Sequence, residues 1–370
     1  MSHLRRGGAA VVLAVGLGAM LLGLPALAAG GWWAGAPGSS PRLSLVASNQ
    51  GSVTLAVSRG APGWYRPGTG QFIPLMLSQS RSGAEAVAVA ATGRLGVVAF
   101  AGGRLLETVR GGSTRWLPSL LGEPRDLALG PGANPRLAAA TSAGVFSGRL
   151  GSRLAKVAPG TGRAVLAPPR RGLPWLALAR GRLLASSDAA RWTPAAGSPR
   201  FAAATAELAE LGSGVILLAE PSGLLWRGYR GRWAPAFQLL PEGGLGGVPR
   251  VTALVADGVD SAYLGTAGFG TLLTPDGGYT WYRAAPPDAE VTALAALGRV
   301  FAEHPHGLVI AVTPQRIYLH RLQALPAPPV YTPAGATAEL AGTAAVAGAA
   351  ALVVVSLLWY LERRRRHLFV

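Results

Sequence analysis

The chain has 370 residues, of which 50% are hydrophobic and 14% are charged. This length suits one large all-β domain or two ordinary domains. The chain contains no cysteine, which excludes disulfide bonds, so its stability must come from packing alone.

The N-terminal segment, residues 1–28, has the pattern of a secretory signal peptide. Arg5 and Arg6 precede an apolar run over residues 9–24, and Ala26 and Ala28 have the small-x-small pattern of a cleavage site. An uncleaved membrane anchor is the alternative. Either form predicts export, and the segment is set aside from the fold.

The body, residues 30–321, has short runs of Val, Leu, Ala and Thr separated by Gly, Pro and Ser, which is typical of many short strands. Similar apolar runs start near residues 43, 85, 125, 164, 206, 251 and 291, with spacings of 42, 40, 39, 42, 45 and 40. A period of about 40 residues with four strands per unit is the signature of a propeller blade. The sequence therefore predicts an all-β, seven-bladed β-propeller.

Each unit also contains runs that suit its second and third strands, and five units contain a run that suits the fourth. The fourth often opens on an aromatic residue, and Trp116, Trp192, Trp233 and Trp281 occupy matching places in four units. A row of tryptophans can stack on a ligand. Their regular position favours packing between blades instead.

The seventh unit lacks a clear fourth strand after residues 316–321. The segment GWWAG, residues 31–35, can supply that strand, which would join the two ends of the domain and hide an edge strand. Residues 322–337 then form a Pro-rich stalk.

The segment at residues 338–361 is predicted to be a transmembrane helix. Residues 341–361 carry no charge, and about 20 apolar residues span a hydrocarbon core. Arg363 to Arg366 follow at once, in a tail of residues 362–370 that should stay cytoplasmic. A buried core helix is the poorer alternative, because it would normally have a polar face. The predicted location is the cell membrane, with one span and the propeller on the extracytoplasmic side.

The turn TPDGGYTW, residues 274–281, carries the most specific local motif. The side chain of Asp276 can accept hydrogen bonds from backbone N–H groups, and Gly277 and Gly278 supply the positive φ of a hairpin turn. The turn resembles the Asp-box, or BNR repeat, with the pattern Ser/Thr-x-Asp-x-Gly-x-Thr-Trp. The matching residues are Thr274, Asp276, Gly278, Thr280 and Trp281.

A second, degenerate copy lies in the fourth unit at Ser186, Asp188 and Trp192, one residue shorter and without the glycine. The resemblance is to Asp-box propellers, which include sialidases, sortilin-type receptors and photosystem II assembly-factor propellers. It covers the whole body as a repeat pattern, but the motif residues cover only two units. In that group the Asp-box is a structural turn, so it implies a fold more than a function.

The resemblance implies a non-catalytic binding or assembly scaffold for a membrane or envelope complex, without a cofactor. The alternative is a receptor-like binder of an envelope glycan or anionic polymer. A sialidase-like hydrolase would require an arginine triad, a Tyr–Glu pair and an Asp acid. The first arginine usually lies in a Phe-Arg-Ile-Pro motif, whereas residues 71–74 read QFIP, and no Tyr–Glu pair stands out. We therefore expect no enzymatic activity.

Other candidate sites are weaker. His304 and His306, with His320 downstream, could bind a metal, but the proline between them and the loop context favour solvent-exposed histidines. Residues 160–163 lack the lysine and the strand–helix setting of a phosphate-binding loop. Residues 257–260 are predicted to form a turn rather than a calcium site.

Three arginines are candidate partner-binding residues, because they lie in long irregular connections. Arg170 and Arg171 belong to the connection at 167–174, and Arg250 ends the connection at 239–250. Together they would give one end of the propeller a positive charge that suits an acidic partner. The net charge of +17 fits an anionic partner too, although an Arg-rich composition is also typical of a GC-rich bacterial genome. The arginines are scattered, which argues against nucleic acid.

Overall fold

In the computed structural model the chain divides into two units, Met1–Ala324 and Leu325–Val370. The structure describes residues 33–35, 42–49, 52–77, 85–132, 134–170, 172–201, 207–239, 250–284, 290–297 and 308–321, all in the first unit. The expected signal peptide, stalk, transmembrane helix and tail lie outside these residues. Within the described part, no helix has the length and hydropathy needed to cross a bilayer.

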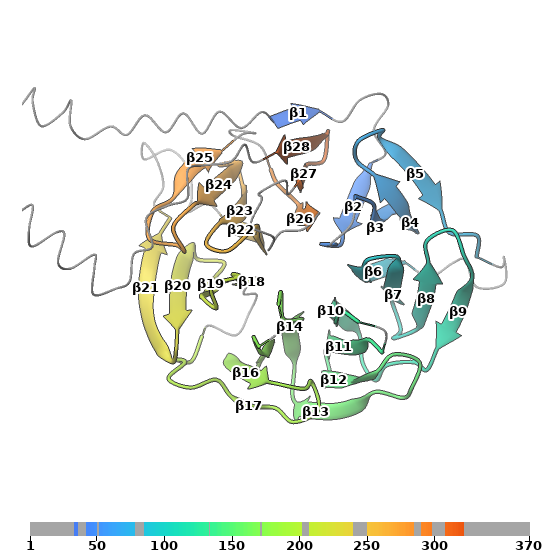
Figure 1. The fold of residues 1–370 in the computed structure, drawn as a ribbon, viewed down its shortest axis with the longest axis horizontal. Coiled ribbons are helices and arrows are strands. Elements are labelled where there is room, and N and C mark those ends of the chain that lie inside the picture. Colours follow the sequence, from blue (N-terminus) through green and yellow to red (C-terminus); the bar gives the residue numbers. More distant parts are fainter. Residues whose placement is uncertain are drawn as a thin grey trace, which may run out of the picture. The chain divides into compact units, whose positions relative to one another are not determined.

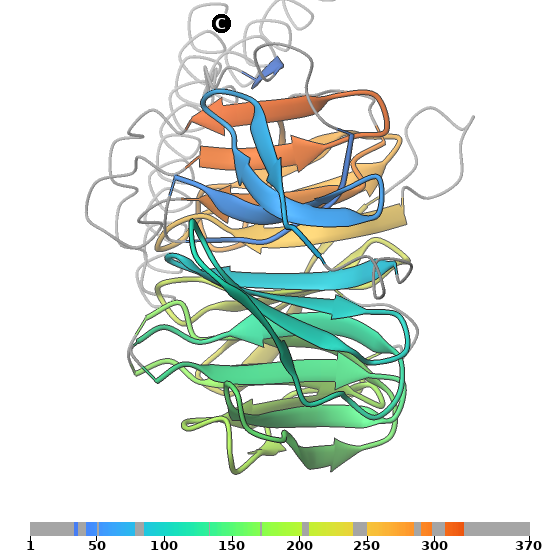
Figure 2. The ribbon, with the colours of Figure 1, turned by 90° about the vertical axis from the view of Figure 1, so that its right-hand side faces the viewer.

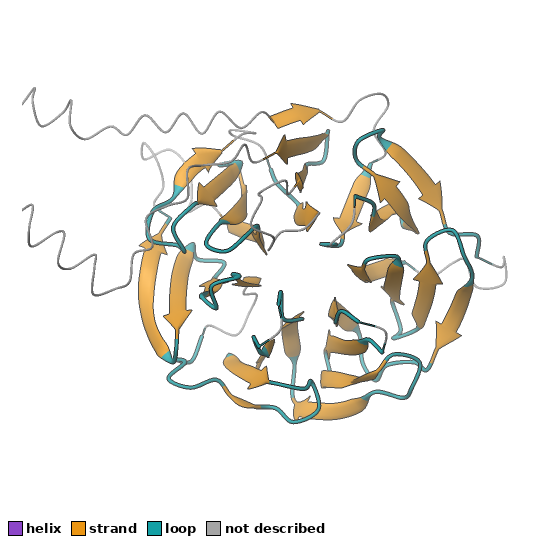
Figure 3. Ribbon diagram, viewed as in Figure 1, coloured by secondary structure: helices purple, strands orange, loops and turns teal. Residues whose placement is uncertain are grey.

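Seven four-stranded antiparallel sheets surround a central axis (Figure 1). The described residues are strands and the turns between them (Figure 3). In six sheets the chain runs from the innermost strand outward, and the seventh is completed by a strand from the start of the body. The prediction of an all-β, seven-bladed propeller is confirmed.

The first three blades consist of β2 (Leu43–Val46), β3 (Thr54–Ser58), β4 (Ala61–Arg66) and β5 (Gln71–Pro74) in the first; β6 (Ala86–Thr92), β7 (Leu95–Phe100), β8 (Leu105–Val109) and β9 (Thr114–Leu117) in the second; and β10 (Pro124–Leu129), β11 (Arg136–Thr141), β12 (Gly144–Arg149) and β13 (Ala155–Pro159) in the third. The next two consist of β14 (Gly162–Leu166), β15 (Trp175–Ala179), β16 (Arg182–Ser186) and β17 (Thr193–Pro194) in the fourth, and β18 (Glu207–Glu210), β19 (Ile216–Ala219), β20 (Leu224–Tyr229) and β21 (Arg232–Gln238) in the fifth. The last two consist of β22 (Arg250–Ala256), β23 (Ala262–Ala267), β24 (Thr271–Thr274) and β25 (Tyr282–Ala284) in the sixth, and β26 (Ala293–Leu297), β27 (Leu308–Val312), β28 (Ile317–Arg321) and β1 (Trp33–Gly35) in the seventh.

The seventh blade is closed by β1, which pairs antiparallel with β28. The register places Trp33 opposite His320, Ala34 opposite Leu319 and Gly35 opposite Tyr318. The expected use of the GWWAG segment as a fourth strand is therefore confirmed. The pairing covers an edge of β28 that would otherwise expose unpaired backbone groups.

The core lies between the blades rather than inside any one of them. Seven clusters of buried apolar side chains occupy the spaces between neighbouring sheets. In β23, for example, Leu264 packs toward the fifth blade, whereas Tyr263 packs toward the seventh. Because both faces of a middle strand are buried, these strands are continuous apolar runs instead of alternating ones.

The four matching tryptophans contribute to these clusters. The ring of Trp116 lies 5.5 Å from that of Phe100, and the ring of Trp233 lies 5.5 Å from that of Phe201. Trp281 stacks on Phe237, with ring centroids 6.2 Å apart. The prediction that these tryptophans pack between blades is confirmed.

The strands run across the ring from one face to the other, so that their turns lie at the two faces (Figure 2). Each blade begins with its inner strand, and all repeat the same meander. The inner strands of all seven blades therefore run in the same direction along the central axis, from one face of the ring to the other. Turns that follow inner strands, and turns between third and fourth strands, share one face, which we call the turn face.

Candidate functional site

The Asp-box turn between β24 and β25 is held by the carboxylate of Asp276. Its Oδ1 accepts hydrogen bonds from the backbone N–H groups of Tyr279 (3.1 Å) and Thr280 (2.9 Å). The hydroxyls of Thr274 and Thr280 donate to the same carboxylate, at 2.9 and 2.5 Å. Gly277 and Gly278 have φ of 72° and 92°. Residues with a side chain rarely adopt such positive φ values, so the turn favours glycine at both positions.

The degenerate turn in the fourth blade has the same arrangement. Asp188 accepts hydrogen bonds from the N–H groups of Ala190 (2.8 Å) and Arg191 (3.0 Å) and from the Ser186 hydroxyl (3.1 Å). The N–H bonds of Arg191 and Ala190 lower the pKa of Asp188 to about 2. The indole N–H of Trp192 donates to the hydroxyl of Ser147 at 3.3 Å, in the preceding blade.

Both turns are fastened to the blade before them through equivalent atoms. The carbonyl after Asp276, that of Gly277, accepts a 2.8 Å hydrogen bond from Arg227 Nε. The carbonyl after Asp188, that of Ala189, accepts a hydrogen bond from the Ser147 hydroxyl. Arg227 and Ser147 are each the fourth residue of a third strand, β20 and β12. The Asp-box turns thus connect neighbouring blades, and neither lines the central channel.

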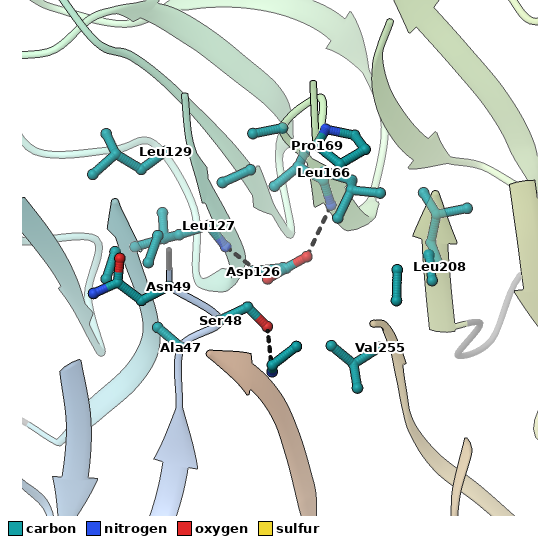
Figure 4. Close-up of a pocket in the computed structure, with 18 of the residues that line it drawn as sticks. Ala47, Ser48, Asn49, Asp126, Leu127, Leu129, Leu166, Pro169, Leu208 and Val255 are labelled. Atoms are coloured by element: carbon teal, nitrogen blue, oxygen red, sulfur yellow. Dashed lines mark hydrogen bonds between the residues drawn. The ribbon is translucent and has the colours of Figure 1, made fainter. Parts of the chain in front are cut away.

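The central channel contains a cavity of about 310 Å³ that is lined by the inner strands of all seven blades. Figure 4 shows part of this lining, which is mostly small and apolar. Three carboxyl groups interrupt it: Asp126 on β10, and Glu207 and Glu210 on β18. Asn49, which follows β2, adds a buried side chain that is 5% exposed.

Asp126 connects two inner strands. Its Oδ1 accepts a hydrogen bond from the N–H of Leu127 (2.8 Å), and its Oδ2 accepts one from the N–H of Val165 on β14 (2.9 Å; Figure 4). Burial raises the pKa of Asp126 to about 7, although the two N–H groups act in the opposite direction. The residue therefore joins the third and fourth blades at the channel wall.

The two glutamates on β18 share this environment. Burial, together with the charge of Asp126, raises the pKa of Glu207 to about 7. Burial also raises the pKa of Glu210 to about 8, against the opposing effect of Arg170. Neither carboxyl oxygen of Glu210 has a hydrogen-bond partner, and the same is true of Asn49 Oδ1. The channel thus offers unused acceptors, which suit a hydrogen-bond donor better than an anion.

The structure separates the candidate arginines. Arg170 is exposed in the β14–β15 connection on the turn face, whereas Arg250 is the exposed first residue of β22. Because the inner strands run in the same direction, a residue that begins an inner strand and a residue that follows one lie on opposite faces of the ring. Arg250 and Arg170 are therefore on opposite faces. Arg171 lies outside the described residues. No single basic surface includes both Arg170 and Arg250.

The other candidate sites from the sequence were the three histidines and residues 257–260. His320 is buried, in contrast to the expected exposure of the histidines, and its Nδ1 lies 2.6 Å from the Tyr263 hydroxyl in the sixth blade. Burial lowers the pKa of His320 to about 4. His304 and His306 lie outside the described residues. Within the described residues, no group of three or more His, Cys, Asp or Glu side chains could hold a metal ion. Residues 257–260 form the predicted turn between β22 and β23, with Asp257 buried.

Sequence reasoning missed the carboxyl groups of the channel. A signal was present, because the runs RDLALG and AELAELG put acidic residues into inner strands that are otherwise apolar. A buried acidic residue is uncommon unless it is paired, so such positions merit attention.

No protein-family model matches the chain, and no curated protein matches it significantly. Solved structures do resemble it. YCF48 bound to D1 peptide matches with a TM-score of 0.58 over 80% of this chain and 97% of that chain, at 14% identity. The Cps50 (Swd1) β-propeller domain of Myceliophteria thermophila matches with a TM-score of 0.61 over 79% and 100%, at 11% identity. A streptogramin B lyase matches with a TM-score of 0.59 over 79% and 98%, also at 11% identity. At such identities the likeness shows the β-propeller fold alone.

Proposed function

We propose that this chain is a non-catalytic binding or assembly scaffold for a membrane or envelope complex. The observation that carries the proposal is the complete ring of seven blades around a lined channel, and a protein of similar fold is solved with a bound peptide. Propellers present their loops and channel ends to partners on a rigid support. A protein segment is the partner that this architecture suits best.

The chemistry of the channel supports binding rather than catalysis. Both oxygens of Asp126 accept backbone hydrogen bonds, which leaves this carboxyl in a structural role. The described propeller also has QFIP in β5, without the arginine that a sialidase-like site would need.

The proposed location rests on the sequence at the two ends of the chain. The signal-like residues 1–28 and the uncharged residues 341–361, followed by four arginines, support an exported propeller with one C-terminal membrane span. A C-terminal tag should then resist protease added to intact cells, while the body is digested. Digestion of that tag from outside would contradict the proposed topology.

The two exposed arginines allow a test that identifies the binding face. A photo-crosslinking residue at position 170 or at position 250 reports on opposite faces of the ring. In native membranes we expect one of the two positions to give a discrete protein adduct, with the other as its matched control. Adducts from neither position would contradict a protein partner at these two faces.

The alternative partner is an anionic envelope polymer, which the positive net charge favours. Retention on isolated envelope polymer, lost at high salt and without any protein adduct, would support this alternative. For either partner, Arg170→Ser and Arg250→Ser should be compared singly. Only the variant on the binding face should weaken capture and reduce its salt dependence.

A further inference from the structure

A second pocket, with a volume of about 400 Å³, lies between the fourth and fifth blades and is separate from the Asp-box turns. Leu176 and Ala185 line it from the fourth blade, and Ile216 and Trp233 line it from the fifth. Glu210 lines this pocket as well as the central channel, and Ser213 lies beside it in the β18–β19 turn. Tyr229 and Arg230 complete the polar part of the lining, so the wall is largely apolar with one carboxyl group, two hydroxyls and one guanidinium.

The side-chain alternation along β18 explains why Glu210 faces this pocket. Leu208, two residues earlier, packs against Leu176 and Leu183 of the fourth blade, whereas Ala209 packs toward the sixth. Residues two apart in a strand share a face, so Glu210 also faces the fourth blade. Its carboxyl group thus enters the space between the two sheets.

Three buried side-chain oxygens of this pocket have no hydrogen-bond partner. Glu210 is 2% exposed, and neither of its oxygens accepts a hydrogen bond. The hydroxyl of Ser213 is buried and likewise has no partner. A buried polar group without a partner is destabilising, and more so when it is charged. Such a group calls for an explanation, and a ligand that pairs with it supplies one.

Neither of the two nearby arginines, Arg170 and Arg230, pairs with the carboxyl group of Glu210. Arg170 opposes the rise in the pKa of Glu210 but does not reach hydrogen-bond distance. Arg230 and Tyr229 both line this pocket, and the guanidinium of Arg230 lies 5.1 Å from the ring centroid of Tyr229. The other ionisable groups that line the channel are the carboxyl groups of Glu207 and Asp126, neither of which is a cation. An external cation would therefore be the first group to pair with Glu210.

We propose that this pocket binds an organic cation through an ammonium or guanidinium group that donates hydrogen bonds to Glu210. The aromatic and aliphatic walls would contact the apolar part of the ligand, and an indole such as that of Trp233 attracts cations through its ring face. One carboxyl and two hydroxyls are too few ligands for a typical metal site. The inference does not depend on the proposed scaffold function.

The ligand chemistry has two sources, a free amine or a Lys side chain of a partner protein, and the probes distinguish them. Phenethylamine represents the first and N-acetyl-lysine amide the second, each titrated into the purified full-length chain. Titrations at about pH 9 keep the alkylammonium protonated, because free lysine has a pKa of about 10.4. Glu210, with its pKa of about 8, is then ionised.

We expect saturable binding of at least one probe, and the tighter one assigns the source. Glu210→Gln should weaken it at least tenfold, which is about 1.4 kcal/mol. The N,N,N-trimethyl analogue should bind more weakly, because it cannot donate a hydrogen bond. Ala196→Trp should block the pocket by bulk from an exposed position without altering Glu210.

Two glutamates provide matched controls. Glu220→Gln changes another buried glutamate, whose Oε1 already accepts a 2.9 Å bond from Trp226 Nε1. Glu207→Gln changes a carboxyl that lines the channel only. Both variants should bind the probes as the wild type does. Absence of saturable binding by the wild type, equal binding by Glu210→Gln, or loss in Glu207→Gln alone would each overturn the proposal.

Discussion

Glu210 should make the body less stable as the pH rises. Its pKa lies near 4.5 in the unfolded chain and at about 8 in the fold, so the folded state holds a proton that the unfolded state has released. Between these values the folded state binds more protons, and stability must fall with increasing pH. Stability is therefore highest below about pH 4.5 for this group and is lost as the pH passes 8.

The magnitude follows from the shift. A pKa unit corresponds to about 1.36 kcal/mol, which gives a ceiling of about 5 kcal/mol for Glu210. Local rearrangement and water entry reduce such penalties, so we expect about 2–3 kcal/mol. In a body of this size that corresponds to a change in Tm of about 5 °C.

Glu210→Gln removes the ionisable group and keeps its shape. Thermal unfolding of the full-length chain at about pH 5 should give similar Tm values for variant and wild type, because the carboxyl is neutral in the folded wild type. At about pH 8.5 the variant should melt about 5 °C higher. Glu220→Gln, the matched control, retains an acceptor for the Trp226 indole and should keep the wild-type slope. Parallel curves for Glu210→Gln and wild type at both pH values would refute the reasoning.

Three further predictions concern the turns and the seam between the blades. Asp276→Ala removes the acceptor for two backbone N–H groups and for the hydroxyls of Thr274 and Thr280. It should cost about 1–2 kcal/mol and lower the Tm without reducing partner capture, and lost capture at an unchanged Tm would make the turn a binding site. Ala34→Pro should break the β1–β28 ladder and produce oligomers through the exposed edge in size-exclusion chromatography, whereas a monomer of unchanged Tm would show that closure is dispensable. The His320 ring, held by Tyr263 and with a pKa of about 4, should show no titration between pH 8 and 5 by NMR, and a midpoint near 6.5 would contradict its burial.

The sequence predicts the fold well because the inner and middle strands are buried. Runs such as that of β7 are apolar at every position, and their spacing repeats once per blade. The fourth strand of the third blade, β13, has the run AKVAP and was not predicted, because it lacks an aromatic residue. Outer strands contact one neighbouring strand and solvent, so their sequences are less constrained.

The site was less predictable for two different reasons. The separation of Arg170 from Arg250 follows from strand order, since one comes after an inner strand and the other begins one. It was available from the sequence. The unpaired state of Glu210 was not, because it depends on which side chains of the fourth blade face β18 across the interface. Side-chain alternation fixes the direction of a residue but not its neighbours.

The pairing of β1 with β28 sets the order in which this propeller can be completed. Most contacts lie within a blade or between successive blades, so each meander can form soon after its strands leave the ribosome. The seventh blade is different, because β1 is synthesised first and its partner strand comes last. During that interval the open ring has free strand edges that can pair with other chains. A chain that ends before β28 cannot form the β1–β28 pairing that closes the ring. Closure of the ring therefore distinguishes a full-length body from a truncated one.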